Sequence, residues 1–450
     1  MGVRRRSGGA RAACNRGDAL MRYALQLALL GIGRSWLLSL LIVASLAIGI
    51  SAFATMLMIR IGLSADPAPA VSRTLYHVEL DLRDGSSRES DNRRLPTMAL
   101  YDVKALSDRT GVPSAATSSS WLPYRSYGSE RRTGMLPVRG FTYGAQSVFD
   151  LNLISGSFWR REDDDAGSRV AVISRSLSRE LFGTESALGK ELELATRSFV
   201  IIGIVEDWNP APRFHDLRGG AYTDNERLYI PLSSWIALPT DYGMGGMTCR
   251  QGVLDDPNHP SCAWLQFWVR LESASTLDAF RGALKNYAEE QIEGGRSTHA
   301  YPNVMSLLEW LEINDVVPED VHTQLWFAIG ILIICLVNAS GLFLAGFVDN
   351  ARETGIRRSL GATRRDVVMQ FALQSTMLGT LGGALSVPLV LVGFHIVKGL
   401  APEHTAHLSL PVWLLLLCPV IALLSAMLSA AVPVWRTSRL PASLLTGEAR

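Results

Sequence analysis

The chain has 450 residues, which is enough for two or three ordinary domains, and 48% of them are hydrophobic. Its 43 basic and 42 acidic residues give a formal net charge of +1, so the total charge predicts no nucleic-acid or other polyanionic partner. The mean hydropathy of +0.17 and the clustering of the apolar residues argue against a purely soluble protein.

The first 35 residues are strongly basic, with seven arginines and a single acid, Asp18. We predict that residues 1–35 form a cytoplasmic segment containing an amphipathic helix that begins near Leu20. A cleaved signal peptide is the alternative. The apolar stretch that follows is longer than the ~7–15 residues of a signal-peptide core, and no cleavage motif is well placed, so we expect a retained helix. Met21 is an alternative start to Met1.

Four apolar stretches predict four transmembrane helices, because a bilayer core needs about 20 such residues in a helix. None of the four contains Asp, Glu, Lys or Arg, which each cost about 3 kcal/mol at the helix centre. Buried helices of a soluble protein are the alternative, and four charge-free runs of this length argue against it. The predicted spans are residues 36–59, 325–347, 371–397 and 410–434.

The charges that flank the spans predict their orientation, since basic residues remain in the cytoplasm. Residues 348–370 and the tail, 435–450, are arginine-rich like the N-terminal segment, whereas the connection 398–409 carries one lysine. We therefore place the N-terminus, 348–370 and the C-terminus in the cytoplasm, and 60–324 and the short loop 398–409 outside it. Tryptophans near the span ends agree with this: Trp36, Trp326, Trp413 and Trp435.

The long outer segment, 60–324, mixes strand and helix patterns without strict alternation. This mixture predicts an α+β domain in two lobes, inserted between the first and second spans. Residues 240–262 are rich in Gly, Pro and Asp and are expected to form a long loop. In chain order we predict a strand over 75–82, a helix over 97–110, a strand over 170–174, a helix capped by Ser174, a hairpin of 190–194 with 198–205, a strand over 267–271 and a helix over 276–291.

Two cysteines, Cys249 and Cys262, fall in the outer segment, within the predicted loop. In an oxidising compartment such a pair is expected to form a disulfide, although the sequence leaves the bridge undecided. Two thiols are too few for a structural zinc site.

The sequence contains no convincing catalytic motif. The stretch Gly183–Glu191 resembles a phosphate-binding loop, but its glycines are too far apart and Glu191 replaces the required Ser or Thr. The acidic run 162–165 is read as a solvated turn, with calcium binding as the alternative. The histidines His395, His404 and His407 lack a metal-ligand spacing. We expect neither enzymatic activity nor a cofactor.

The cytoplasmic segment 348–370 holds the most specific motif. Its residues predict a short helix, a break at Gly361 and a new helix capped by Thr363 that leads into the third span. The stretch 352–362, RETGIRRSLGA, resembles the R-E-x-G-[IL]-R-[KR]-x-[LIM]-G-A motif of MacB/FtsX-type ABC transporter permeases. Further similar stretches follow the order of that family: 170–174, 181–183, 188–190, 203–205, 433–436 and 440–442.

The resemblance implies a MacB-like periplasmic core domain and a dimer with a second permease, identical or related. It also implies that cytoplasmic ATPase subunits bind and hydrolyse the ATP, and that residues 304–324 form a stalk extending the second span. Two departures stand out: the chain carries no ATPase domain, and Gln374 replaces a common Glu. The residues that match the family's ATPase-contacting region are Arg352, Glu353, Gly355, Ile356, Arg357, Arg358, Leu360, Gly361 and Ala362.

The resemblance further implies export of a periplasmic or outer-leaflet substrate from the bacterial inner membrane by mechanotransmission. The alternative is an FtsX-like signalling protein that controls a cell-wall hydrolase. Besides the ATPase and the bilayer, a periplasmic adaptor and an outer-membrane channel are expected partners, and nucleic acid is not. The residues do not specify the substrate.

Overall fold

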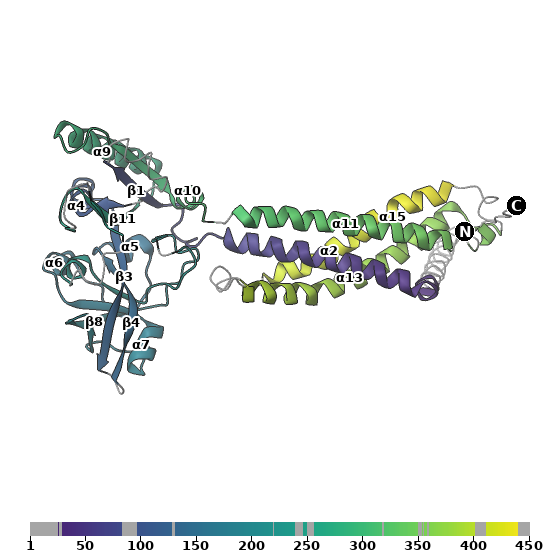
Figure 1. The fold of residues 1–450 in the computed structure, drawn as a ribbon, viewed down its shortest axis with the longest axis horizontal. Coiled ribbons are helices and arrows are strands. Elements are labelled where there is room, and N and C mark those ends of the chain that lie inside the picture. Colours follow the sequence, from purple (N-terminus) through teal and green to yellow (C-terminus); the bar gives the residue numbers. More distant parts are fainter. Residues whose placement is uncertain are drawn as a thin grey trace, which may run out of the picture. The chain divides into compact units, whose positions relative to one another are not determined.

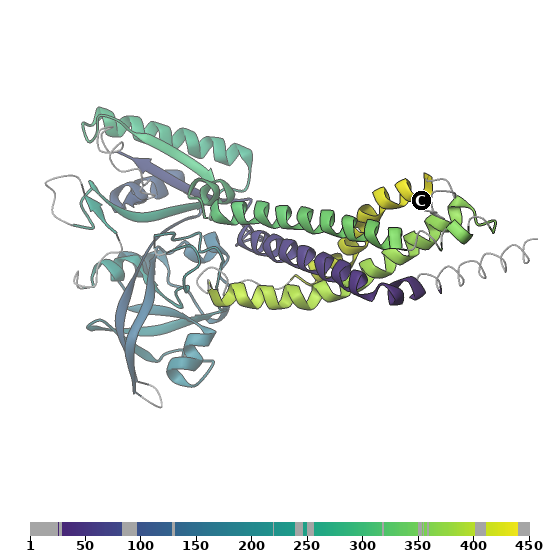
Figure 2. The same cartoon turned by 45° about the vertical axis from the view of Figure 1, so that its right-hand side comes forward.

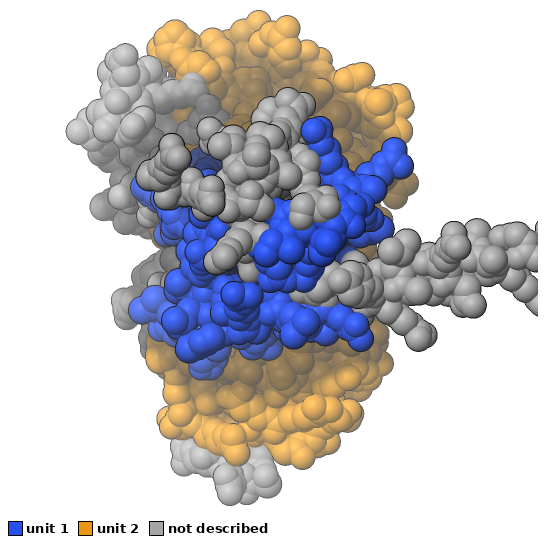
Figure 3. Space-filling model, turned by 90° about the vertical axis from the view of Figure 1, so that its right-hand side faces the viewer, with its two compact units in different colours: residues 1–64, 318–450 blue, residues 65–317 orange. Residues whose placement is uncertain are grey.

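The computed structural model describes residues 26, 29–82, 97–127, 131–218, 220–238, 246–249, 256–316, 319–349, 353, 355–357, 360–400 and 411–439. The chain forms two compact units, shown in different colours in Figure 3: one joins residues 1–64 to 318–450, and the other holds residues 65–317. The second unit is inserted after the first long helix, as the sequence predicts.

The first unit contains long apolar helices. Four helices in the described ranges have the length and composition to cross a membrane. α2 packs against both α11 and α13 (Figures 1 and 2), and α13 also packs against α15. Their bounds are α2 (Trp36–Leu63), α11 (Glu319–Asp349), α13 (Arg364–Leu400) and α15 (Val412–Arg439).

Small residues let these helices approach closely. A Cβ on Gly49 of α2 would lie 2.8 Å from the Cβ of Cys335 on α11, which is closer than real Cβ atoms come. On α13, a Cβ on Gly383 would lie 2.7 Å from the Cα of Pro419 on α15. Close backbone approach through glycine is the usual way in which helices associate in lipid, where no hydrophobic effect drives them together.

The second unit is built on a 12-stranded sheet. One lobe is centred on β1 (Leu75–Asp81), which pairs with β12 (Tyr301–Ser306) and β11 (Cys262–Arg270). The short strands β2 (Met98–Ala99) and β10 (Thr248–Cys249) also pair with β11. Three helices belong to this lobe: α4 (Leu100–Thr110), α9 (Ala274–Glu293) and α10 (Leu307–Ile313).

The other lobe is a closed ring of strands. Pairing runs from β3 (Ser114–Tyr127) through β4, β9, β6, β8 and β7 and returns to β3. The start of β3 pairs with β11, so this strand belongs to both lobes. The remaining elements are β4 (Arg131–Phe141), α5 (Ala145–Phe149), β5 (Leu153–Gly156), α6 (Arg161–Asp165), β6 (Val170–Ser174), α7 (Arg175–Phe182), β7 (Glu191–Leu194), β8 (Arg197–Val205), β9 (Leu228–Pro231) and α8 (Leu232–Ile236).

A buried charge network joins the lobes near β3. Arg139 on β4 is fully buried and donates to Glu226 through Nη2 (2.6 Å to Oε1) and to Thr117 on β3 (2.9 Å). Asp216 accepts from Arg139 (3.4 Å) and from Gln266 on β11 (3.3 Å). Burial raises the pKa of Glu226, but Arg139, His215 and Arg213 together outweigh it, so the pKa is lowered overall. Removing one member of such a network typically costs about 3–5 kcal/mol, because its partner stays buried and unpaired.

Several expected elements are confirmed. Residues 170–174 form β6, and Ser174 Oγ accepts the N–H of Leu177 (3.2 Å) at the start of α7. β7 and β8 form the predicted hairpin.

Three expectations are wrong. The stretch 304–324 is not one stalk, because β12 ends at Ser306, and Ser306 then caps the separate helix α10. The acidic run contains the short helix α6, whose Asp164 is buried and accepts from Ser233 Oγ (3.1 Å) and from the N–H of Tyr143 (3.1 Å). The predicted loop 240–262 includes β10 and the first residue of β11.

We predict that His77 makes the second unit sensitive to acid. His77 is fully buried, stacks on Trp310 (3.8 Å between ring centroids), and its ring nitrogens have no hydrogen-bond partner among the described residues. Burial lowers its pKa from 6.5 to about 3, so between these values the unfolded chain binds a proton that the folded chain does not. At pH 5 this costs about 2 kcal/mol of stability relative to pH 7.

The variant His77→Phe keeps the stacking and removes the proton. Urea unfolding followed by tryptophan fluorescence should therefore show a loss between pH 7 and pH 5 that is about 2 kcal/mol smaller in the variant than in the wild type. Equal losses in the two proteins would contradict this account.

Candidate coupling site

The described residues between α11 and α13 include a turn at Leu360 and Gly361. This described part begins at Glu353, and Gly355, Ile356 and Arg357 are helical. The N–H of Ala362 bonds to the carbonyl of Arg357 (3.0 Å). Gly361 has a φ of +107°, which a residue with a side chain rarely adopts, and this confirms the predicted break.

A reciprocal cap starts the next helix. Asp366 Oδ2 accepts from the N–H of Thr363 (2.8 Å) and from its hydroxyl (2.7 Å), while Thr363 Oγ1 accepts from the N–H of Asp366 (3.3 Å). Two N-terminal donors are satisfied in this way, and α13 begins at Arg364, as the sequence predicts.

Glu353 links this segment to the chain before α2. Its Oε2 accepts from Arg34 Nη1 (3.3 Å), and its other oxygen accepts from Arg357, one helical turn later. Arg357 in turn reaches Gln370 of α13 (3.5 Å). The Arg34 and Glu353 side chains are 74% and 45% exposed, so their ion pair contributes little stability, and its effect is to position the two segments.

The same segment exposes apolar side chains. Leu360 is 83% exposed and Ile356 is 48% exposed. The exposed Arg364 and Arg365 follow directly at the start of α13. A large exposed apolar residue beside cationic ones is typical of a surface that a partner covers.

The sequence predicted part of this site. Glu353, Gly355, Ile356, Arg357 and the turn 360–362 lie together in it, whereas Arg352 and Arg358 lie outside the described residues. The pairing of Glu353 with Arg357 follows from their spacing of four. Sequence reasoning missed Arg34 and Gln370, and no local pattern could have revealed Arg34, which lies 319 residues before Glu353.

A cavity of about 480 Å³ opens beside these residues. It is bounded by the helical residues 29–34, by the coupling segment and by the start of α13. Its lining residues are Leu29, Leu30, Gly31, Gly33, Arg34, Glu353, Arg357, Gln370, Phe371 and Gln374.

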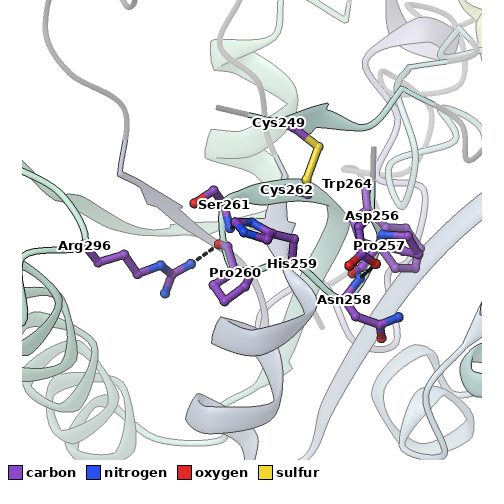
Figure 4. The surroundings of a disulfide bond; sticks show 10 residues. All are labelled: Cys249, Asp256, Pro257, Asn258, His259, Pro260, Ser261, Cys262, Trp264 and Arg296. Carbon is purple, nitrogen blue, oxygen red and sulfur yellow. Dashed lines mark hydrogen bonds between the residues drawn. A yellow bond between two sulfur atoms is a disulfide. The ribbon is translucent and has the colours of Figure 1, made fainter. Parts of the chain in front are cut away.

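A second feature of the sequence analysis lies in the other unit. Cys249 and Cys262 are opposite each other on β10 and β11 and are joined by a disulfide (Figure 4). The carbonyl of Pro260, within the loop that the bridge closes, accepts from Arg296, which also donates to Asp102 of α4 (2.8 Å). The bridge therefore holds a loop that is also tied to α4.

We predict that this disulfide stabilises the second unit. It joins residues 13 apart, and the loss of chain entropy on closing a loop of that size is worth about 3 kcal/mol. The double variant Cys249→Ser/Cys262→Ser should unfold at a lower urea concentration, with a free energy of unfolding that is smaller by about 3 kcal/mol. A reducing agent should have the same effect on the wild type. Identical unfolding with and without the reducing agent would show that the bridge is not formed or contributes nothing.

Comparison with known proteins identifies the family. The model of the MacB-like periplasmic core domain matches residues 39–287, which is more than half of the chain, and that of the FtsX-like permease C-terminal domain matches residues 325–442. The chain belongs to the MacB/FtsX-like ABC transporter permease family. The order of the two matches is the order of the α+β unit and the last three long helices.

Individual relatives are distant. An uncharacterised ABC transporter permease of Bacillus subtilis, YknZ, is 25% identical over 306 residues, covering 68% of this chain and 68% of its own. The macrolide export ATP-binding/permease protein MacB of Marinobacter nauticus is 20% identical over 370 residues, covering 81% of this chain but 52% of its own. The chain thus spans about half the length of that MacB relative.

Among solved structures, the periplasmic region of MacB from Actinobacillus actinomycetemcomitans aligns with 54% of this chain and 94% of its own, at 16% identity and a TM-score of 0.35. That likeness is too weak to add to the family assignment. Membership and the four apolar helices make this an inner-membrane protein with a periplasmic-type core domain.

Proposed function

We propose that this chain is the membrane subunit of an ABC transporter, in which the coupling segment, residues 353–366, receives the motion of a separate ATPase. ATP is bound and hydrolysed on that partner. Both termini and the coupling segment face the cytoplasm, and the core domain faces the periplasm. The FtsX-like family match supports the ATPase partner.

The exposed Leu360 carries this proposal. An apolar side chain that is 83% exposed, on a turn outside the apolar spans, gains free energy when a partner protein covers it. The neighbouring arginines prefer an acidic rim on the partner. The turn is also held firmly, by the Thr363–Asp366 cap and by the Gly361 conformation, so that a push on Leu360 moves the start of α13.

Movement of the coupling segment can reach the other helices by two routes. The first runs directly along α13, which packs against α2 and α15. The second runs from Glu353 to Arg34, two residues before α2 begins. Because α2 and α11 are the helices that flank the core domain in the sequence, movement of either changes the points at which the chain enters and leaves that domain.

On this account the protein works by mechanotransmission, with a second permease, identical or related, completing the dimer. The substrate is a periplasmic or outer-leaflet molecule, and a periplasmic adaptor and an outer-membrane channel are further proposed partners. The relatives named macrolide export proteins support an export role.

Two variants test the coupling. Leu360→Asp and Arg357→Glu should lower the affinity for the partner ATPase by at least tenfold. The first places a charge in a desolvated contact, and the second replaces the guanidinium that holds Glu353 with another carboxylate. The measurement is the amount of the ABC ATPase retained on the purified permease, together with its ATP turnover. Leu308→Asp is the matched control, since Leu308 is an exposed leucine (55%) of the core domain.

Both coupling variants should insert into the membrane as the wild type does, and the control variant Leu308→Asp should retain the ATPase as the wild type does. Retention of the ATPase and export at wild-type levels in both coupling variants would remove the assignment of residues 353–366.

A further inference from the structure

The cavity beside Glu353 combines positive charge with neutral polar groups. Arg34 and Arg357 supply two positive charges against the one negative charge of Glu353, which leaves a net charge of +1 on its lining. The carboxamides of Gln370 and Gln374 add donors that can bind an anion without a further charge. Guanidinium groups and amides together are the usual ligands of phosphate oxygens.

Apolar residues line the same cavity. Leu29 and Leu30 are 53% and 69% exposed, and Phe371 lies on the α13 side. A soluble anion would leave these leucines in contact with water. An amphiphile would cover them with hydrocarbon while its charged end met the arginines.

The position of the cavity along the spans agrees with an amphiphile. Arg34 stands two residues before Trp36, where α2 and its apolar run begin, and Phe371 is the first residue of the predicted third span. Basic and aromatic residues at a span end lie at the level of the lipid headgroups. Basic pockets between transmembrane helices on the cytoplasmic side are known to suit anionic headgroups.

Little space lies beyond Gln374. Gln374 also lines a second crevice of only about 10 Å³, whose other walls include Leu38, Ile42 and Phe343. That volume holds about one water molecule and no acyl chain. The hydrocarbon of a bound amphiphile therefore lies outside this crevice, along the exposed Leu29 and Leu30.

We propose that this cavity binds the phosphate headgroup of an anionic phospholipid. The phosphate lies between Arg34 and Arg357 and competes with Glu353 for both. The content of anionic lipid thereby adjusts the link between the residues before α2 and the coupling segment. This regulatory meaning rests on the proposed function, whereas lipid binding does not require it.

A binding experiment without any ATPase tests lipid binding separately from the proposed regulatory role. The purified full-length chain is mixed with equal amounts of phosphatidylglycerol and phosphatidylcholine, and the lipids that it retains are measured by native mass spectrometry. Phosphatidylglycerol should be retained in preference. Inorganic phosphate and ATP are added in separate arms, because either is an alternative source of the same phosphate chemistry.

Two variants locate the site. Gln374→Glu is isosteric and adds a negative charge to the lining, and Arg34→Gln removes a positive charge from a side chain that is 74% exposed. Each should lower the retention of phosphatidylglycerol by about fivefold, the change expected for one unit of charge facing an anionic lipid. Gln324→Glu, at an exposed position of α11, is the matched control and should bind as the wild type does.

Preference for phosphatidylglycerol that falls in both cavity variants but not in the control supports the site. Equal retention of the two lipids by the wild type, or an equal loss in the control, would overturn it. Displacement of the lipid by inorganic phosphate or ATP would also overturn it, by showing that the cavity takes a free phosphate. Loss of ATPase coupling in the same variants has no bearing on these outcomes.

Discussion

A helix that crosses a bilayer must satisfy its backbone hydrogen bonds internally, and every charged side chain at mid-depth is costly, so the arrangement of the first unit depends on that constraint. The four long helices meet it with charge-free runs and approach one another through glycines such as Gly49 and Gly383. Charged side chains are consequently absent from the predicted spans. They gather where the runs end, and Glu353, with Arg34 and Arg357 on either side, is the clearest example.

The second unit depends on a different kind of interaction, a buried network of charged side chains. Its two lobes share β3, and the fully buried Arg139 binds residues on β3 and on the loop that follows β8. Such a network is costly to assemble and costly to break, so it favours one arrangement of the lobes over intermediate ones.

The sequence predicted elements whose signals are local and missed those that depend on distant partners. The four spans, β6 with its Ser174 cap and the break at Gly361 each depend on a few neighbouring residues. The closed ring of strands, the separation of β12 and α10 from α11 and the burial of Asp164 depend on tertiary packing. In the candidate site, the motif directed attention to the segment around Glu353, but Arg34 joins it only because helix packing brings the residues before α2 beside it.

The central claim is that residues 353–366 face the compartment of the ATPase. The direct measurement is labelling of Leu360→Cys with a membrane-impermeant maleimide, with Cys14, Cys335 and Cys418 replaced by serine. Asp278→Cys, on the exposed side of α9, serves as the marker of the opposite face. The account predicts that Leu360→Cys is labelled only in inside-out vesicles and Asp278→Cys only in right-side-out ones. Labelling of Leu360→Cys in right-side-out vesicles would contradict it.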